Sequence, residues 1–234
     1  MRRIAALVIA VLAAQALLAI TVGEKEITCS ICGTKNTITV LRSYGSYACL
    51  PEGELDLVPC PIVYTSSIWS CRQCRYTSYV DDAEVPAGKV SAVHRFLDSV
   101  PPGPYSPTMS DQLVIAEGVY RALGRDDEFW ADFYRSAGFF ATQEKEHEQA
   151  RRWRAEALKA YERLLADPKR ASYRKEDLLA AGAVAAKLGQ DTLAREYLKK
   201  VPGAAWDQPD TDPEDLAAMD QLARRILESP EVTL

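Results

Sequence analysis

Six cysteines are the residues of this chain whose type and spacing could do chemistry, and all of them lie between residues 29 and 74. Four form two CxxC pairs, Cys29 with Cys32 and Cys71 with Cys74. Two thiolates three positions apart can bind one metal ion from a tight turn, and two such turns complete a closed tetrahedral site. The spacing therefore favours a structural Zn²⁺ ion bound by these four cysteines.

Two other interpretations of the CxxC pairs stay open. Disulfide bonds would suit an exported chain, because secreted proteins fold in oxidising compartments and six cysteines can all pair. A redox-active CxxC is the other, since Trp69 precedes Cys71 as in thioredoxin-type motifs, although no βαβ pattern surrounds it.

If the four thiolates bind a divalent ion, the site carries a net negative charge. Three basic residues are near enough in sequence to offset this charge, unless they are simply solvated: Lys35, Arg72 and Arg75.

The remaining two cysteines, Cys49 and Cys60, lie in a segment rich in proline, glycine and acidic residues. Their spacing favours a local disulfide between them. Free thiols, or membership in the metal site, are the alternatives. Whether the four CxxC cysteines bind zinc or form disulfides, we expect the metal content not to depend on Cys49 and Cys60.

A small β-rich module is expected to position the CxxC pairs. Runs of β-forming residues lie between the pairs, at residues 37–41, 62–64 and 68–69. Gly33 suits the turn after the first pair, where the backbone must adopt a positive φ. A module of this size buries little apolar surface, so a metal or disulfides must help to hold it. We assign residues 24–87 to a zinc-ribbon-like cysteine module, and expect loss of its metal to leave the helices downstream in place.

Residues 88–234 are expected to form helices, because apolar residues recur there at helical spacing. Gly182, Ala194 and Leu198 match the small and packing positions of a TPR hairpin, Gly189 falls at its turn, and Gly138 opens a similar unit. The expected fold class is α+β, with the zinc-ribbon-like module followed by an all-α bundle of TPR-like helical hairpins. Helices are expected at residues 90–100, 113–123, 129–146, 150–165, 175–188, 192–199 and 213–227.

The first 23 residues have the pattern of a signal peptide or an N-terminal anchor. Arg2 and Arg3 precede an uncharged apolar run over residues 4–20, and Ala14-Gln15-Ala16 fits a small-x-small cleavage pattern. Cleavage near Gly23, or retention of residues 4–20 as a membrane anchor, is also compatible with the pattern. The chain is therefore expected to be exported to the periplasm or another extracytoplasmic compartment, with membrane contact only through this segment.

The order of the motifs resembles a bacterial family of unknown function in which paired CxxC knuckles precede TPR-like helices. The likeness covers residues 27–200 and includes Cys-Pro-x-x-Tyr at 60–64 and Trp-x-CxxC-x-Tyr at 69–76. It implies that the four CxxC cysteines are the metal ligands. The chain departs from the family pattern in three ways. Arg75 stands where a second glycine is expected, the knuckles lack their usual prolines, and the chain has a signal segment.

Several classes of function are disfavoured by what the sequence lacks. A net charge of −5 does not suit nucleic-acid binding. Neither of the two histidines, His94 and His147, belongs to a catalytic pattern, no phosphate-binding glycine loop or GxSxG motif is present, and no catalytic residues are predicted. We therefore expect an exported, non-catalytic zinc-binding module that binds a protein or peptide through its helices. The first candidates for contact with that partner are Lys175, Glu176 and Lys187. The alternative is a thiol-disulfide or metal-handling protein that uses its CxxC pairs.

Overall fold

The computed structural model describes residues 21–43, 68–101, 107–206 and 212–228. The chain divides into two compact units, and along the sequence the boundary between their described parts falls between Leu123 and Gly124. The boundary predicted after residue 87 lies inside the first unit. The reason is that the two helices that follow residue 87 share a core with the cysteine module.

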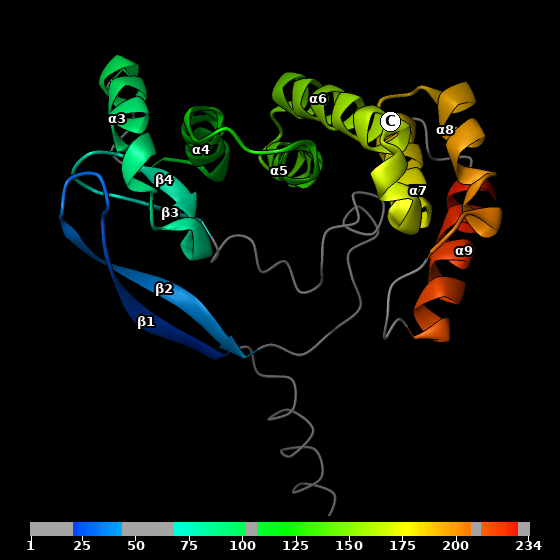
Figure 1. Ribbon diagram of the computed structural model, residues 1–234, viewed down its shortest axis with the longest axis horizontal. Helices are drawn as coiled ribbons and strands as arrows, with labels where there is room; N and C mark the ends of the chain where they lie inside the picture. The colour runs from blue at the N-terminus through cyan, green and yellow to red at the C-terminus, as the bar shows by residue number, and fades with distance from the viewer. Residues whose placement is uncertain (1–20, 44–67, 102–106, 207–211, 229–234) are drawn as a thin grey trace, which may run out of the picture. The chain divides into compact units, whose positions relative to one another are not determined.

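The first unit contains two antiparallel ribbons, each of two strands (Figure 1). Strands β1 (Thr21–Thr28) and β2 (Lys35–Ser43) form one ribbon, and β3 (Ile68–Ser70) and β4 (Thr77–Tyr79) form the other. The predicted β-forming runs at 37–41 and 68–69 fall in β2 and β3, whereas residues 62–64 lie outside the described chain. Strand β1 begins at Thr21, within the segment that the sequence assigns to a signal peptide or anchor.

Two α-helices complete the first unit, α3 (Val90–Ser99) and α4 (Met109–Leu123), after the short 3-10 helices η2 (Val80–Asp82) and η3 (Ala87–Lys89). They contribute the buried Val93, Leu97 and Val119 to the same core as the cysteines. Tyr120 of α4 is also fixed to the second ribbon, because its hydroxyl accepts a hydrogen bond from the backbone N–H of Tyr79 at 2.8 Å. Burial raises the pKa of the Tyr120 hydroxyl, so this group stays protonated and can donate to Asp82 Oδ2 at 3.1 Å.

The second unit is helical in all of its described residues with regular structure. Helices α5 and α6 pack against each other, as do α7 and α8, and α9 packs on α7 and α8 (Figure 1). Two short 3-10 helices, η4 and η5, lie before α7 and after α8. The bounds are α5 Asp127–Gln143, α6 His147–Ala166, η4 Pro168–Tyr173, α7 Arg174–Lys187, α8 Asp191–Leu198, η5 Val201–Gly203 and α9 Pro213–Glu228.

The two hairpins of the second unit repeat one packing contact 44 positions apart. A Cβ atom added to Gly182 of α7 would lie 2.6 Å from Cγ of Leu198 in α8. One added to Gly138 of α5 would lie 2.8 Å from Cγ of Arg154 in α6. Both separations are shorter than a van der Waals contact, so each pair of helices approaches closely where the sequence predicts a small residue.

The turns of the two hairpins repeat at the same interval. Lys145 and Gly189 both have positive φ, at 64° and 72°. The residue after each of them donates its backbone N–H to a carbonyl five positions earlier, at 2.8 Å in the first turn and 2.9 Å in the second. This is the hydrogen bond of a helix end closed by a left-handed residue. The helical hairpins expected around Gly138 and Gly182 are therefore present and equivalent to each other.

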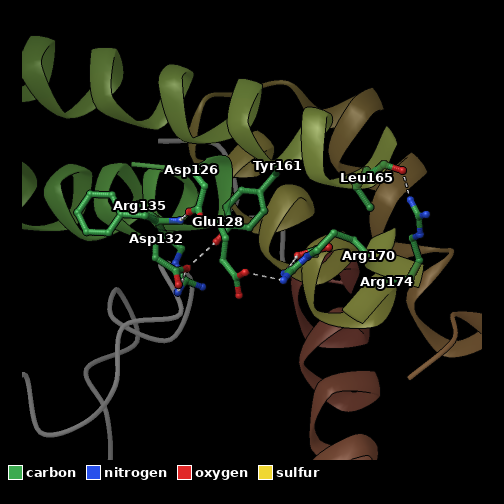
Figure 2. Close-up of polar contacts among 10 residues, drawn as sticks. Asp126, Glu128, Asp132, Arg135, Tyr161, Leu165, Arg170 and Arg174 are labelled. Atoms are coloured by element: carbon green, nitrogen blue, oxygen red, sulfur yellow. Dashed lines mark hydrogen bonds and ion pairs between the residues drawn. The ribbon is translucent and has the colours of Figure 1, made fainter. Parts of the chain in front are cut away.

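Ion pairs join the first hairpin to the second (Figure 2). The guanidinium of Arg170 in η4 contacts Glu128 Oε2 of α5 at 2.8 Å and Asp177 Oδ1 of α7 at 3.1 Å. Asp132 of α5 accepts hydrogen bonds at Oδ1 from Arg135 and from the hydroxyl of Tyr161 in α6. Because Asp177 is buried, the Arg170 pairs fix how the second hairpin meets the first, whereas Asp132 links α5 to α6 within the first hairpin.

Lys175 at the start of α7 is buried, contrary to its predicted place on a partner-binding surface. Its side chain is 6% exposed, and its Nζ lies 2.5 Å from Asp220 Oδ1 of α9 and 3.0 Å from the carbonyl oxygen of Val201. A buried ammonium group needs such partners, and here they tie α9 to α7. Lys175 is therefore a structural residue.

Candidate metal centre

The first CxxC pair lies in the turn between β1 and β2. The backbone N–H of Cys29 donates to the carbonyl of Thr34 at 2.9 Å, and the N–H of Gly33 donates to the carbonyl of Cys29 at 2.9 Å. Gly33 adopts a φ of 72°, the left-handed conformation that glycine takes without a steric penalty. This turn folds the chain back so that Cys29 and Cys32 lie on one side of it.

The second CxxC pair lies in the turn between β3 and β4 and has the same backbone hydrogen bonds. The N–H of Cys71 donates to the carbonyl of Tyr76, and the N–H of Arg75 donates to the carbonyl of Cys71, both at 2.8 Å. Arg75 occupies the position of Gly33 and has a φ of 62°. The two turns, which we call the first and second knuckle, are therefore equivalent despite the missing glycine.

The side chain of Arg75 accounts for its presence at a position that favours glycine. Its guanidinium donates to the carbonyl oxygens of Val100 and Pro101, which follow the last turn of α3. Carbonyl groups at a helix C-terminus have no partner within the helix and carry partial negative charge. Arg75 thus fastens the second knuckle to α3, which offsets the cost of the left-handed backbone.

The two knuckles bring all four predicted cysteines together. Their Sγ atoms lie within 4.8 Å of one another. The Sγ atoms of Cys29 and Cys74 are 3.6 Å apart, as are those of Cys32 and Cys71. In a tetrahedral site with zinc–sulfur bonds of about 2.3 Å, sulfur atoms are separated by about 3.8 Å. The two Sγ–Sγ separations are close to this value, and the four free thiols lie near enough together to bind one metal ion.

Asn36 joins the two knuckles and was not among the predicted site residues. Its Nδ2 donates to the Sγ of Cys71 at 3.6 Å and to the carbonyl of Thr34 at 2.9 Å. Its Oδ1 accepts the backbone N–H of Arg72 at 3.1 Å. The sequence shows only an asparagine between the first knuckle and a run of β-forming residues, and its burial becomes visible in the structure.

The thiols differ in how readily they ionise. Burial raises the pKa of Cys29 and of Cys74, although backbone N–H groups of their own knuckles oppose that effect. At Cys32, burial also raises the pKa, but hydrogen bonds with the side chain and backbone of Thr34 outweigh it and lower the pKa to about 6. Knuckle amides directed at sulfur stabilise thiolates, the form in which cysteine binds metal.

Two of the three basic residues expected to offset the thiolate charge use their side chains elsewhere. Lys35 forms an exposed ion pair with Glu26 at 2.9 Å. Arg75 binds the carbonyl groups beyond α3, as described above, and Arg72 contributes its backbone N–H to Asn36. The sulfur atoms themselves have hydrogen bonds with backbone groups of the knuckles, the Asn36 amide and the Thr34 hydroxyl.

The knuckles are part of the core of the first unit. Cys29 and Cys71 are each 1% exposed and pack in one cluster with Trp69, Tyr76 and Val93. The rings of Trp69 and Tyr76 meet edge to face at 5.8 Å, and the Tyr76 hydroxyl donates to a backbone carbonyl at 2.9 Å. Because α3 and α4 supply part of this cluster, loss of the metal should affect them as well as the ribbons.

Other sequence candidates lie elsewhere or outside the described chain. His94 pairs with Asp98 at 3.4 Å on an exposed face of α3, and His147 is exposed at the start of α6. Within the described residues, the four CxxC cysteines are the group of three or more His, Cys, Asp or Glu side chains that could hold a metal ion. Cys49 and Cys60, with their predicted disulfide, fall outside those residues.

The chain matches no protein-family model, no curated protein and no solved structure. Its resemblance to a bacterial family with paired knuckles therefore stays a prediction. None of the helices in the described residues is long and apolar enough to cross a membrane. Residues 4–20, the predicted anchor, lie outside the described residues.

Proposed function

We propose that this chain is an exported, non-catalytic zinc-binding protein-interaction module of the bacterial cell envelope. The observation that carries the proposal is the convergence of four Sγ atoms within 4.8 Å, from two knuckles with the same backbone hydrogen bonds. Four thiolates in a tetrahedral arrangement are a common donor set for Zn²⁺. The metal is Zn²⁺, and its ligands are Cys29, Cys32, Cys71 and Cys74.

The role of this zinc is structural. Four protein ligands complete its coordination, so no position remains for water or substrate, which a catalytic zinc requires. The two ribbons have few apolar residues of their own, and the core of the first unit passes directly through Cys29 and Cys71. Metal binding then contributes to the folding free energy of the whole first unit.

Protein binding is assigned to the helical hairpins of the second unit. Equivalent positions in the two hairpins support a TPR-like arrangement: Gly138 corresponds to Gly182, and Lys145 to Gly189. The repeat is longer than in regular TPR proteins. Stacked hairpins bury one face on their neighbours and leave the other for a partner. Glu176, exposed on α7, is the first contact residue to test, whereas the buried Lys175 is excluded.

The metal is tested by recovering the whole protein under reducing conditions and measuring its metal content by mass spectrometry. About one zinc per chain is expected. Cys71→Ser should abolish this content, whereas the matched control with Cys49 and Cys60 both replaced by Ser should keep it. Protein that contains no zinc, and takes up none when zinc is added to the reduced thiols, contradicts the proposal.

The interaction and export proposals need separate experiments in living cells. Cross-linking should capture a specific polypeptide, and Glu176→Lys should reduce that capture without unfolding the protein. Gly182→Arg should abolish it by unfolding, because Leu198 occupies the space. A reporter active only in the periplasm should be active when fused after residue 30, as Arg2, Arg3 and the apolar run predict.

A second candidate function, thiol-disulfide exchange or metal handling, is favoured by the exposure of Cys32. A working redox pair offers one accessible thiolate of lowered pKa, and Cys32 has both properties. The two functions differ in whether the cysteines keep a metal ion or react with a substrate. A structural site keeps its metal over many rounds of assay, whereas a redox pair turns over a disulfide substrate and loses that activity on Cys32→Ser.

A further inference from the structure

The four metal ligands differ in their exposure to solvent. Cys29 and Cys71 are each 1% exposed, and Cys74 is half-buried. Cys32 alone among the four is exposed. The difference follows from the chain path, because Cys29 and Cys71 lie two positions after the buried Ile27 of β1 and Trp69 of β3. Cys32 lies further along the turn of the first knuckle.

We propose that Cys32 is the ligand-exchange position of the metal centre, where an external thiolate replaces a protein ligand. In this step the bond between the metal and Cys32 Sγ breaks while a bond from the metal to the incoming sulfur forms. The Cys32 thiolate is released to solvent, and the oxidation state of the metal does not change. The inference rests on the proposed function, because it requires that the four cysteines bind the metal.

The neighbours of each sulfur exclude exchange at the buried ligands. The amide of Asn36 lies against Cys71 Sγ at 3.6 Å, and Asn36 is itself buried. Cys29 packs with Trp69 and Tyr76 in the core that includes α3 and α4. An incoming ligand can reach either sulfur only if this core opens, which costs much of the stability of the first unit.

At Cys32 the surroundings are open. Its sulfur contacts Thr34 Oγ1 at 3.3 Å, on the same exposed turn, and the sulfur atoms of the other ligands. A small thiol can therefore approach the metal from this side without any movement of the helices. The partner that fits is a compact thiolate donor, either a low-molecular-weight thiol or a cysteine on a flexible segment of another chain.

The test follows the order in which the cysteines react in the zinc-loaded, full-length protein. A sub-stoichiometric amount of N-ethylmaleimide is added, and peptide mass spectrometry measures labelling at each cysteine. Cys32 should be labelled at least about tenfold faster than Cys29, Cys71 and Cys74, since accessible thiolates react and buried cysteines are inert. A chromophoric chelator present in the same solution should record zinc release at the rate of Cys32 labelling.

Two histidine variants provide a matched comparison, because histidine can also bind zinc. Cys32→His should slow the zinc release caused by N-ethylmaleimide by at least about tenfold, whereas Cys74→His should leave it fast. First labelling at another ligand of the zinc-loaded protein, or equal rates at all four, would overturn the exchange proposal alone. Absence of zinc, measured before labelling, would overturn the proposed function and this inference with it.

Discussion

Asn36 donates a hydrogen bond from Nδ2 to the Sγ of Cys71, at 3.6 Å and across 35 positions of sequence. The same side chain accepts the backbone N–H of Arg72, so one buried amide holds the second knuckle against the strand that follows the first. Groups that bind the ligands of a metal orient them and adjust their charge. Asn36 is therefore the residue that most directly sets the relative position of the two knuckles.

Replacing Asn36 by Asp should lower the affinity for zinc by roughly 10–100-fold, the usual effect of losing such a supporting contact. A carboxylate can still accept the N–H of Arg72, but it cannot donate to Cys71 and adds negative charge beside a thiolate. Competition with a chromophoric chelator measures the change. Thr37→Ala, at the exposed neighbouring position of β2, should leave the affinity unaltered. Equal affinities for the two variants would contradict the assigned role.

Arg75 provides a second test, because it combines a strained backbone with a tether. Arg75→Ala keeps the positive φ and loses the hydrogen bonds to Val100 and Pro101, so it should destabilise the first unit. Arg75→Gly loses the same bonds but removes the strain, and should be more stable than Arg75→Ala by about 1 kcal/mol. Urea unfolding of the two zinc-loaded variants gives the difference. If the two variants unfold at the same urea concentration, the backbone at this position is not strained.

The hairpin turns of the second unit allow a second comparison of glycine with other residues at positions of positive φ. Lys145→Gly should stabilise the second unit by about 0.5–1 kcal/mol, because glycine adopts the φ of 64° without strain. Gly189→Ala, at the equivalent turn, should destabilise it by about 1 kcal/mol. Thermal unfolding followed at the helical signal checks both. Changes of the same sign in the two variants would show that the turns are not equivalent.

The cysteine site and the hairpin contacts could be predicted from sequence because short-range spacing determines them. The CxxC intervals indicated all four candidate ligands, and Gly182 with Leu198 indicated a close helix contact that the structure contains. The residues that were missed depend on contacts between distant segments. Asn36 meets Cys71 only once both knuckles have formed, and no local pattern encodes that meeting.

The structure differs from two predictions, the surface position of Lys175 and the boundary after residue 87, for a similar physical reason. Lys175 was expected on the surface, because lysine is almost never fully buried unless it is paired. Its partner Asp220 lies in α9, 45 positions later, and that pairing makes burial tolerable. The boundary after residue 87 followed a change from strand to helix periodicity. Periodicity does not reveal that α3 and α4 complete the core around the cysteines.

The claim that the metal centre holds the first unit together is tested most directly by hydrogen exchange before and after zinc removal. The full-length protein is treated with a chelator while its thiols are kept reduced, and protection is mapped along the chain. We predict that β1 to β4, α3 and α4 lose protection together, because they share the core through Cys29 and Cys71. Helices α5 to α9 should keep theirs. Unchanged protection in α3 and α4 after the zinc has left, or loss of protection throughout α5 to α9, would contradict the account.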